Sequence, residues 1–114
     1  MSRDTVYLLD ILQSARLAVA YLSGWTQERF LGSTEKQDSV VRRLVIIGEA
    51  ARRVSSQTRS QLAGIAWEKM TAMRNFVVHE YDDVDMAIVW DTVQHDLPDL
   101  IAAIKHLVPP EDAE

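Results

Sequence analysis

The sequence contains no cysteine, only four glycines and three prolines, and no long apolar run. The absence of cysteine excludes disulfides, thiolate zinc sites and cysteine nucleophiles. No stretch approaches the roughly 20 apolar residues that cross a bilayer, and the N-terminus does not read as a signal peptide. We therefore expect a soluble, cytoplasmic protein without membrane contact. A length of 114 residues suits one domain with its own core.

Motifs for metal and phosphate-loop chemistry are also missing. There is no His-Glu-x-x-His, glycine-rich phosphate loop or Gly-x-Ser-x-Gly. His95 and His106 lack carboxylates at metal-ligand spacing, and we interpret both as surface residues. Glu80, Asp82 and Asp83 follow His79, but their carboxylates fall in a turn and are not spaced to converge on one metal ion. We predict neither a metal site nor a cofactor.

Charge is unevenly distributed along the chain. The net charge is −5, which by itself argues against a nucleic-acid binder. Between Arg42 and Arg74, however, seven basic residues stand against two acidic ones, so this segment carries +5 and the remainder −10. Such a distribution fits either a surface that meets phosphate or an ordinary solvated helix surface of mixed charge.

Apolar residues recur three and four positions apart almost throughout, the period of amphipathic helices. The main stripes run over 8–22, 40–54, 66–77 and 90–108. They predict an all-α, antiparallel four-helix bundle with one or two short extra helices, formed by a single domain over residues 1–110. After Pro109-Pro110, residues 111–114 are predicted to form a flexible tail.

Three local features refine this prediction. Thr34, with Gln37 three residues later, fits a capping box better than Ser33 as the start of the second long helix. Gly48 lies inside that helix at a cost of about 1 kcal/mol relative to alanine, and such a glycine often permits close approach of another helix or a ligand. Pro98 removes a backbone hydrogen bond and predicts a kink or a tightened turn.

The helices carry more apolar surface than one stripe requires. The first helix also bears Tyr7, Leu9, Leu17 and Tyr21, outside its main stripe. The alternatives are a generously packed monomer and self-association, and we favour a homodimer.

The run Arg74-Asn75-Phe76-Val77-Val78-His79-Glu80-Tyr81 gathers groups suited to phosphodiester chemistry. Arg74 offers a planar cationic fork that matches phosphate, and His79 can exchange protons near neutral pH. Asn75 could orient either group or the phosphate. Taken alone, an Arg-x4-His pattern is more often a salt bridge and a helix-end histidine, and Tyr81 more often a packing aromatic.

This run fits the Arg-x4-His-x-Tyr motif of the HepT-like toxins in the HEPN superfamily, which the chain resembles in two further blocks. Val41–Arg53 looks like the second helix of that family, and Val89–Pro98 looks like its closing helix. The three blocks follow one another in family order and cover most of the chain.

The resemblance implies a homodimeric toxin that cleaves RNA, with Arg74 and His79 as its catalytic pair. It also implies a nucleotidyltransferase antitoxin that silences the toxin by transferring AMP from ATP onto the residue matching Tyr81. A second possibility is a non-catalytic helical module that binds and regulates the nucleotidyltransferase. A third is a structural dimer in which the motif residues only tie helices together.

One geometric difficulty accompanies the catalytic pair. Residues five apart on an ideal helix differ by about 140° in direction, so Arg74 and His79 would not share a face. Three arrangements would bring them together. The helix loosens near Phe76–Val78, the Arg74 side chain reaches round, or His79 of one copy meets Arg74 of another.

Overall fold

The computed structural model describes residues 2–109, and the predicted tail 111–114 lies outside this range. Within it every element is helical, which confirms the all-α fold. The long helices are α1 (Arg3–Tyr21), α3 (Thr34–Arg53) and α5 (Trp67–His79). The last long helix consists of α6 (Met86–Asp91), a π-helical turn (Thr92–Asp96) and α7 (Leu97–Ile104). Short connecting helices are α2 (Gln27–Leu31), α4 (Ser56–Gln61) and the 3-10 turn Tyr81–Asp83.

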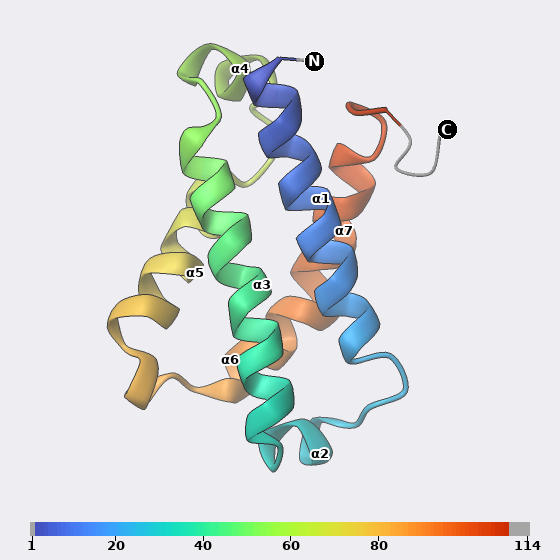
Figure 1. The fold of residues 1–114 in the computed structure, drawn as a ribbon, viewed down its shortest axis with the longest axis vertical. Helices are drawn as coiled ribbons and strands as arrows, with labels where there is room; N and C mark the ends of the chain where they lie inside the picture. Colours follow the sequence, from blue (N-terminus) through green and yellow to red (C-terminus); the bar gives the residue numbers. More distant parts are fainter. Residues whose placement is uncertain (1, 110–114) are drawn as a thin grey trace.

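Successive long helices run antiparallel, as Figure 1 shows. α1 packs against both α3 and α7, and α3 packs against α5 on its other side. The chain therefore forms a bundle in which α5 is joined to the rest mainly through α3. None of the helices in the described part of the chain combines the length and apolar character needed to cross a membrane.

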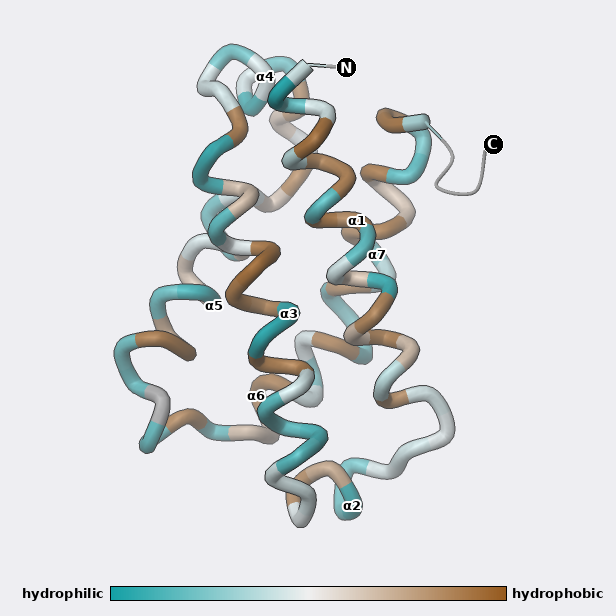
Figure 2. Tube along the Cα trace, viewed as in Figure 1, coloured by the Kyte–Doolittle hydropathy of each residue, from teal (hydrophilic) through white to brown (hydrophobic). Residues whose placement is uncertain are grey.

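The predicted apolar stripes supply most of the core, although Ala66 is exposed and Met73 is only half-buried. On α3 the whole predicted seam is buried, namely Val40, Leu44, Ile47, Ala51 and Val54. Figure 2 shows apolar turns alternating with hydrophilic ones along α1 and α3. At one end of the bundle, Phe30 of α2 is fully buried and its ring lies 5.7 Å from that of Trp90. Burial of side chains of this size contributes about 1.5–3 kcal/mol each and stabilises the bundle in the absence of any disulfide.

α3 begins where it was predicted, at Thr34, but the preferred N-cap was wrong by one residue. Ser33, rather than Thr34, is the N-cap, and its hydroxyl accepts a hydrogen bond from the Lys36 backbone N–H at 3.2 Å. The expected capping-box partner Gln37 instead donates to the backbone oxygens of Phe30 and Leu31. Gln37 therefore fixes the end of α2 against α3, a tertiary role that its spacing from Thr34 does not reveal.

Pro98 distorts the last helix as predicted, but the turn before it widens instead of tightening. The Leu97 backbone N–H donates to the Thr92 carbonyl five residues back, the pattern of a π-helix. Proline lacks an N–H, and its ring clashes with the carbonyl four residues earlier in a regular helix. A wider turn relieves that clash while the helix continues into α7.

Candidate functional site

Gly48 sets the distance between α3 and α5. A Cβ atom added there would lie 2.1 Å from Cβ of Arg74 and 2.9 Å from the backbone oxygen of Met70. Only glycine allows the two helices to approach so closely, which confirms the expectation that Gly48 permits another helix to come near. As a result, the stem of Arg74 lies directly against the backbone of α3.

The Arg74 guanidinium is held by a carboxylate of α3. Its Nε and Nη2 donate to the same oxygen of Glu49, Oε1, at 2.9 and 2.6 Å. Its Nη1 donates to Oδ1 of the neighbouring Asn75 at 3.0 Å. The Arg74 side chain is 19% exposed, so it is largely shielded but still in contact with solvent.

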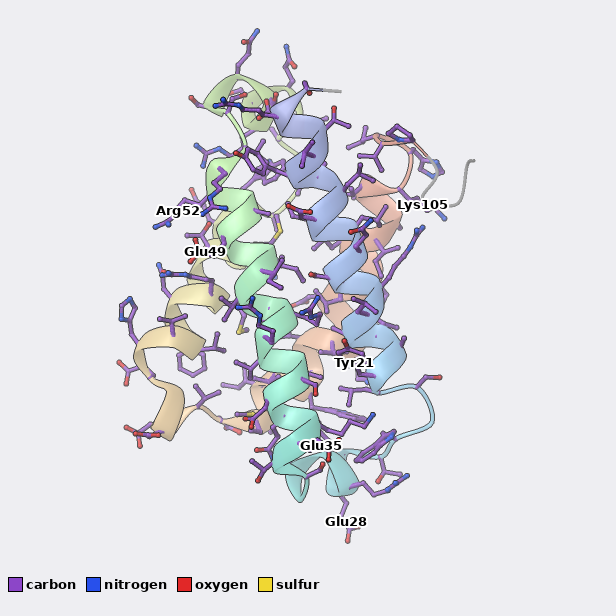
Figure 3. The ribbon with its side chains drawn as sticks, viewed as in Figure 1. Tyr21, Glu28, Glu35, Glu49, Arg52 and Lys105 are labelled. Carbon is purple, nitrogen blue, oxygen red and sulfur yellow. The ribbon has the colours of Figure 1, made fainter. Side chains whose placement is uncertain are left out.

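Glu49 connects Arg74 to a second arginine. Its other oxygen, Oε2, accepts from Nη2 of Arg52 at 3.0 Å, and the Arg52 side chain is exposed. In Figure 3 Glu49 and Arg52 lie together on the upper half of α3. The hydrogen bond from Arg74 lowers the pKa of the Glu49 carboxyl below its ordinary value, with the charges of Arg74, Arg52 and Arg53 adding to the effect. Glu49 therefore stays ionised and holds its two arginine partners at neutral pH.

The side chains of Arg74 and His79 are not brought together within one chain. α5 is an unbroken α-helix from Trp67 to His79, and the Glu80 N–H still bonds to the Phe76 carbonyl at 3.0 Å. The helix therefore does not loosen over Phe76–Val78, so that alternative is wrong. Arg74 points toward α3, where Glu49 holds it, and His79 is exposed in the last turn of α5.

The other two predicted residues lie beside this pair. Asn75 is exposed and contacts the Arg74 guanidinium through its amide oxygen, as an orienting residue would. The backbone of Tyr81 begins the 3-10 turn directly after α5, two residues beyond His79. Its side chain lies outside the described part of the structure.

An apolar groove separates α5 from the last helix. Its volume is about 490 Å³, and its floor is formed by Leu44 and Ile47 of α3. Met73 and Phe76 line its α5 wall, and the opposite wall is formed by α6, the π-helical turn and α7. The groove exists because α5 packs on α3 and leaves its seam with the last helix open.

The part of α3 from Arg42 to Arg53 is basic, and Arg52 belongs to the network around Arg74 through Glu49. Arg42, Arg52 and Arg53 are exposed on α3, and in the segment 42–74 Glu49 is one of only two acids. His95 and His106 are exposed, as interpreted from the sequence. Across residues 2–109 no three His, Asp or Glu side chains gather in a way that would hold a metal ion.

Glu49 is the residue that sequence reasoning missed, because it was counted only as one acid in a basic stretch. The available signal was its place next to a glycine inside a helix. A lone acid at a point of close helix approach is well placed to meet an arginine from the neighbouring helix.

Comparison with known proteins gives a consistent result. Residues 11–107 match the model of the family described as "Ribonuclease HepT-like". The chain is 34% identical over 94 residues to "Probable ribonuclease HepT" of Thermococcus cleftensis, covering 82% of this chain and 86% of that protein. It is 30% identical over 111 residues to "Putative RNase TTE0752" of Caldanaerobacter subterraneus subsp. tengcongensis, covering 97% and 99% of the two chains.

A longer archaeal relative shares only part of its length with this chain. "Gamma-glutamylcyclotransferase and putative RNase MJ0434" of Methanocaldococcus jannaschii is 35% identical over 101 residues, which are 88% of this chain but 46% of that protein. No solved structure matches the chain at a significant level.

Proposed function

Because this chain belongs to the HepT-like ribonuclease family, we propose that it is a metal-independent endoribonuclease and the toxin of a toxin–antitoxin pair. Arg74 would bind the scissile phosphate, and His79 would transfer protons. The observation that carries the proposal is the Arg74 guanidinium, held by Glu49 and Asn75 on a basic surface. A fixed, partly shielded cation of this kind is suited to stabilising charge on a phosphorane-like transition state.

The reaction needs only groups from the protein and the RNA. The ribose 2′-hydroxyl loses its proton to a base and attacks the neighbouring phosphorus, and the bond from phosphorus to the 5′-oxygen breaks. An acid protonates the departing 5′-oxygen, which leaves a 2′,3′-cyclic phosphate and a 5′-hydroxyl. His79 can act as either base or acid, and positioned proton transfer is worth about 10²–10⁴-fold in rate.

We propose that a second copy completes the site. Within one chain Arg74 faces α3 and His79 lies on another side of α5. Of the three arrangements that would bring these side chains together, contact between two copies is the one left. Phe76 lies three residues before His79, about 60° away around the helix, and lines the apolar groove. A copy seated over the groove would bury Phe76 and lie beside His79.

The chemistry of the groove supports an identical partner. Its lining is largely apolar, and it carries the exposed Lys69 on one wall and the exposed Asp96 on the other. A two-fold interface joins the same surface to itself, so a surface with both signs of charge is complementary to its own copy. Two copies would also supply two His79 side chains, one as base and one as acid.

The antitoxin would be a nucleotidyltransferase that attaches AMP to Tyr81. The tyrosine oxygen would attack the α-phosphorus of ATP, form a P–O bond and displace diphosphate. The placement of the Tyr81 backbone two residues after His79 supports this role. A bulky anion attached there would repel the RNA backbone and obstruct access to His79.

Replacement of His79 tests the nuclease. His79→Ala should fold with an unchanged Tm, because the side chain is exposed, and should cleave RNA about 10²–10⁴-fold more slowly. The matched control is His106→Ala, which removes another exposed histidine and should retain full activity. Equal cleavage and equal growth inhibition by wild type and His79→Ala would contradict the proposal and favour a non-catalytic module.

Intact-mass measurement tests the antitoxin. After co-expression with a nucleotidyltransferase encoded beside it, the chain should gain one or more AMP masses, and Tyr81→Phe should gain none. Tyr7→Phe, which alters a half-buried tyrosine on α1, should still be modified. Modification that persists in Tyr81→Phe would place the acceptor elsewhere.

A further inference from the structure

The contact between Glu49 and Arg74 has the geometry of a positioning device. Arg74 donates from Nε and Nη2 to one oxygen, Oε1, so the carboxylate occupies one of the two planar edges that a guanidinium can offer. The bond to Asn75 uses one further N–H, on Nη1. A guanidinium carries five N–H groups, and these three bonds leave two, one on Nη1 and one on Nη2. Those two are the N–H groups with which Arg74 can still bind a phosphate.

The carboxylate is itself held in place. Arg52 binds Oε2 at 3.0 Å, so the two oxygens of Glu49 have different partners and the carboxylate plane is fixed from both sides. Glu49 is 25% exposed and lies one residue after the glycine that brings α3 against α5. α3 therefore sets the position of the carboxylate and, through Arg52, helps to fix its orientation toward Arg74 of α5.

The charge of the network still favours an anion. Glu49 supplies one negative charge against the two positive charges of Arg74 and Arg52, and the exposed Arg53 follows four residues after Glu49 on the same helix. The pKa of Glu49 is lowered mainly by Arg74, so the carboxylate keeps its charge throughout the neutral range. Glu49 orients the arginine without cancelling the positive potential around it.

We infer that Glu49 is a positioning residue that holds the Arg74 guanidinium with its free end directed toward the RNA phosphate. This inference rests on the proposed nuclease function and assigns to Glu49 no contact with RNA. The competing explanation is an ordinary salt bridge that joins α3 to α5. The two explanations differ in what Glu49→Ala changes. A helix tie lowers the stability of the fold and loses activity only as far as the protein unfolds, whereas a positioning residue lowers kcat in protein that is fully folded.

The test uses the full chain and a fluorescently labelled, mixed-sequence single-stranded RNA oligonucleotide. Glu49→Ala should lower kcat by about 10–100-fold, since small misplacements of a catalytic group are that costly, with a smaller change in KM. Glu49→Gln should be intermediate, because its amide oxygen can still accept from Nε and Nη2. Glu35→Ala is the matched control. It removes an exposed acid at the other end of α3 (Figure 3) and should cleave like wild type.

A double-mutant cycle tests whether Glu49 acts through Arg74, and the comparison of kcat with thermal stability separates positioning from a helix tie. In an Arg74→Ala background, adding Glu49→Ala should cause no further loss of kcat. Independent losses that multiply in the double variant would overturn the inference, as would a Glu49→Ala enzyme as active as Glu35→Ala. Thermal unfolding of each variant shows whether a loss of activity reflects unfolding.

A second measurement works even if the protein does not cleave RNA. The probe is a 2′-O-methyl RNA oligonucleotide of the same sequence, which cannot be attacked by its own 2′-hydroxyl. Removal of an acid makes the surface more positive, so simple electrostatics predicts tighter binding for both Glu49→Ala and Glu35→Ala. Positioning predicts the opposite for Glu49→Ala. Its Kd should rise severalfold when Arg74 is present, and adding Glu49→Ala to Arg74→Ala should leave the Kd unchanged.

The outcomes of the two measurements are distinct. If the wild-type protein does not cleave RNA, the proposed nuclease function is overturned. The Kd values of the single and double variants then still decide whether Glu49 acts through Arg74. If wild type cleaves RNA, and Glu49→Ala binds RNA more tightly and is fully active, the positioning role is overturned and the proposed nuclease function stands.

Discussion

Two carboxylates, Asp4 and Glu49, each join helices that are distant in sequence, and they do so with different partners. Asp4 accepts from the Ser55 N–H and from the hydroxyls of Ser55 and Thr58, all neutral donors around the start of α4. Glu49 accepts from two arginines. The pKa of each carboxyl is lowered, in Asp4 chiefly by the Ser55 hydroxyl and in Glu49 chiefly by the Arg74 guanidinium.

The difference in partners separates a structural role from the functional role that we propose. The donors around Asp4 are directed at the carboxylate or at the cap of α4, and the cluster retains a net negative charge. The network around Glu49 retains a net positive charge and two N–H groups of Arg74 that these bonds do not use. The first arrangement joins α1 to the start of α4, and in the proposed function the second holds a cation for the RNA phosphate.

The largest effect is expected from Gly48→Ala, which disturbs the network of Glu49 and Arg74. The new methyl group would lie 2.1 Å from Cβ of Arg74, and one contact atom is backbone, so α3 and α5 must separate. We expect a loss of about 1–3 kcal/mol in unfolding free energy, which outweighs the gain in helix propensity of about 1 kcal/mol. RNA cleavage should fall by on the order of 10²-fold as Arg74 moves.

The control for this change is Gly64→Ala, where an added Cβ meets no atom within 4 Å. Chemical denaturation and the RNA oligonucleotide assay on both variants give the comparison. A Gly48→Ala protein as stable and active as Gly64→Ala would show that the close approach of the helices has no importance.

An intermediate effect is expected from Asp4→Ala, which breaks the other cluster. Loss of the bonds to Ser55 and Thr58 should free the start of α4 and lower Tm by on the order of a few °C. RNA cleavage measured well below Tm should not change. Asp10→Ala removes the same charge from the same helix and should leave Tm nearly unaltered. A loss of cleavage in Asp4→Ala that exceeds its loss of folded protein would contradict the division of roles.

The smallest effect is expected in the acid dependence of stability. Both carboxyls have a folded-state pKa below the ordinary value. Each therefore adds stability that is fully present above its unfolded pKa and is lost as the pH falls through its lowered folded pKa. Thermal unfolding from about pH 6 to pH 2 should show a decline in Tm that is shallower in Asp4→Asn and in Glu49→Gln than in wild type. Parallel curves for all three proteins would show that neither carboxylate contributes in this way.

Much of the fold followed from apolar periodicity. The stripe Val40 to Val54 predicted the buried face of α3, and its residues are all buried. Predictions that depended on neighbours in space were less successful. Ser33 took the cap assigned to Thr34, because Gln37 bonds to the end of α2 and not to its own helix. Pro98 signalled a distortion, but its direction depended on how the helix could continue into α7.

The candidate site likewise combines features set by local sequence with features set by contacts in space. The run from Arg74 to Tyr81 and the position of Gly48 are properties of the sequence, and they indicated phosphodiester chemistry and close helix approach. Glu49 lies 25 residues before Arg74, and no local period links the two positions. Their contact arises only because α3 and α5 pack side by side.

The sequence by itself determined an all-α chain, its long helices and the residues suited to RNA chemistry, because these depend on local periodicity and on side-chain type. Only the tertiary structure decided that Arg74 turns toward α3 and that His79 remains exposed on another side of α5. It also decided that an apolar groove stays open between α5 and the last helix. These features depend on which helices lie next to each other, and helix packing is set by contacts between residues far apart in the chain.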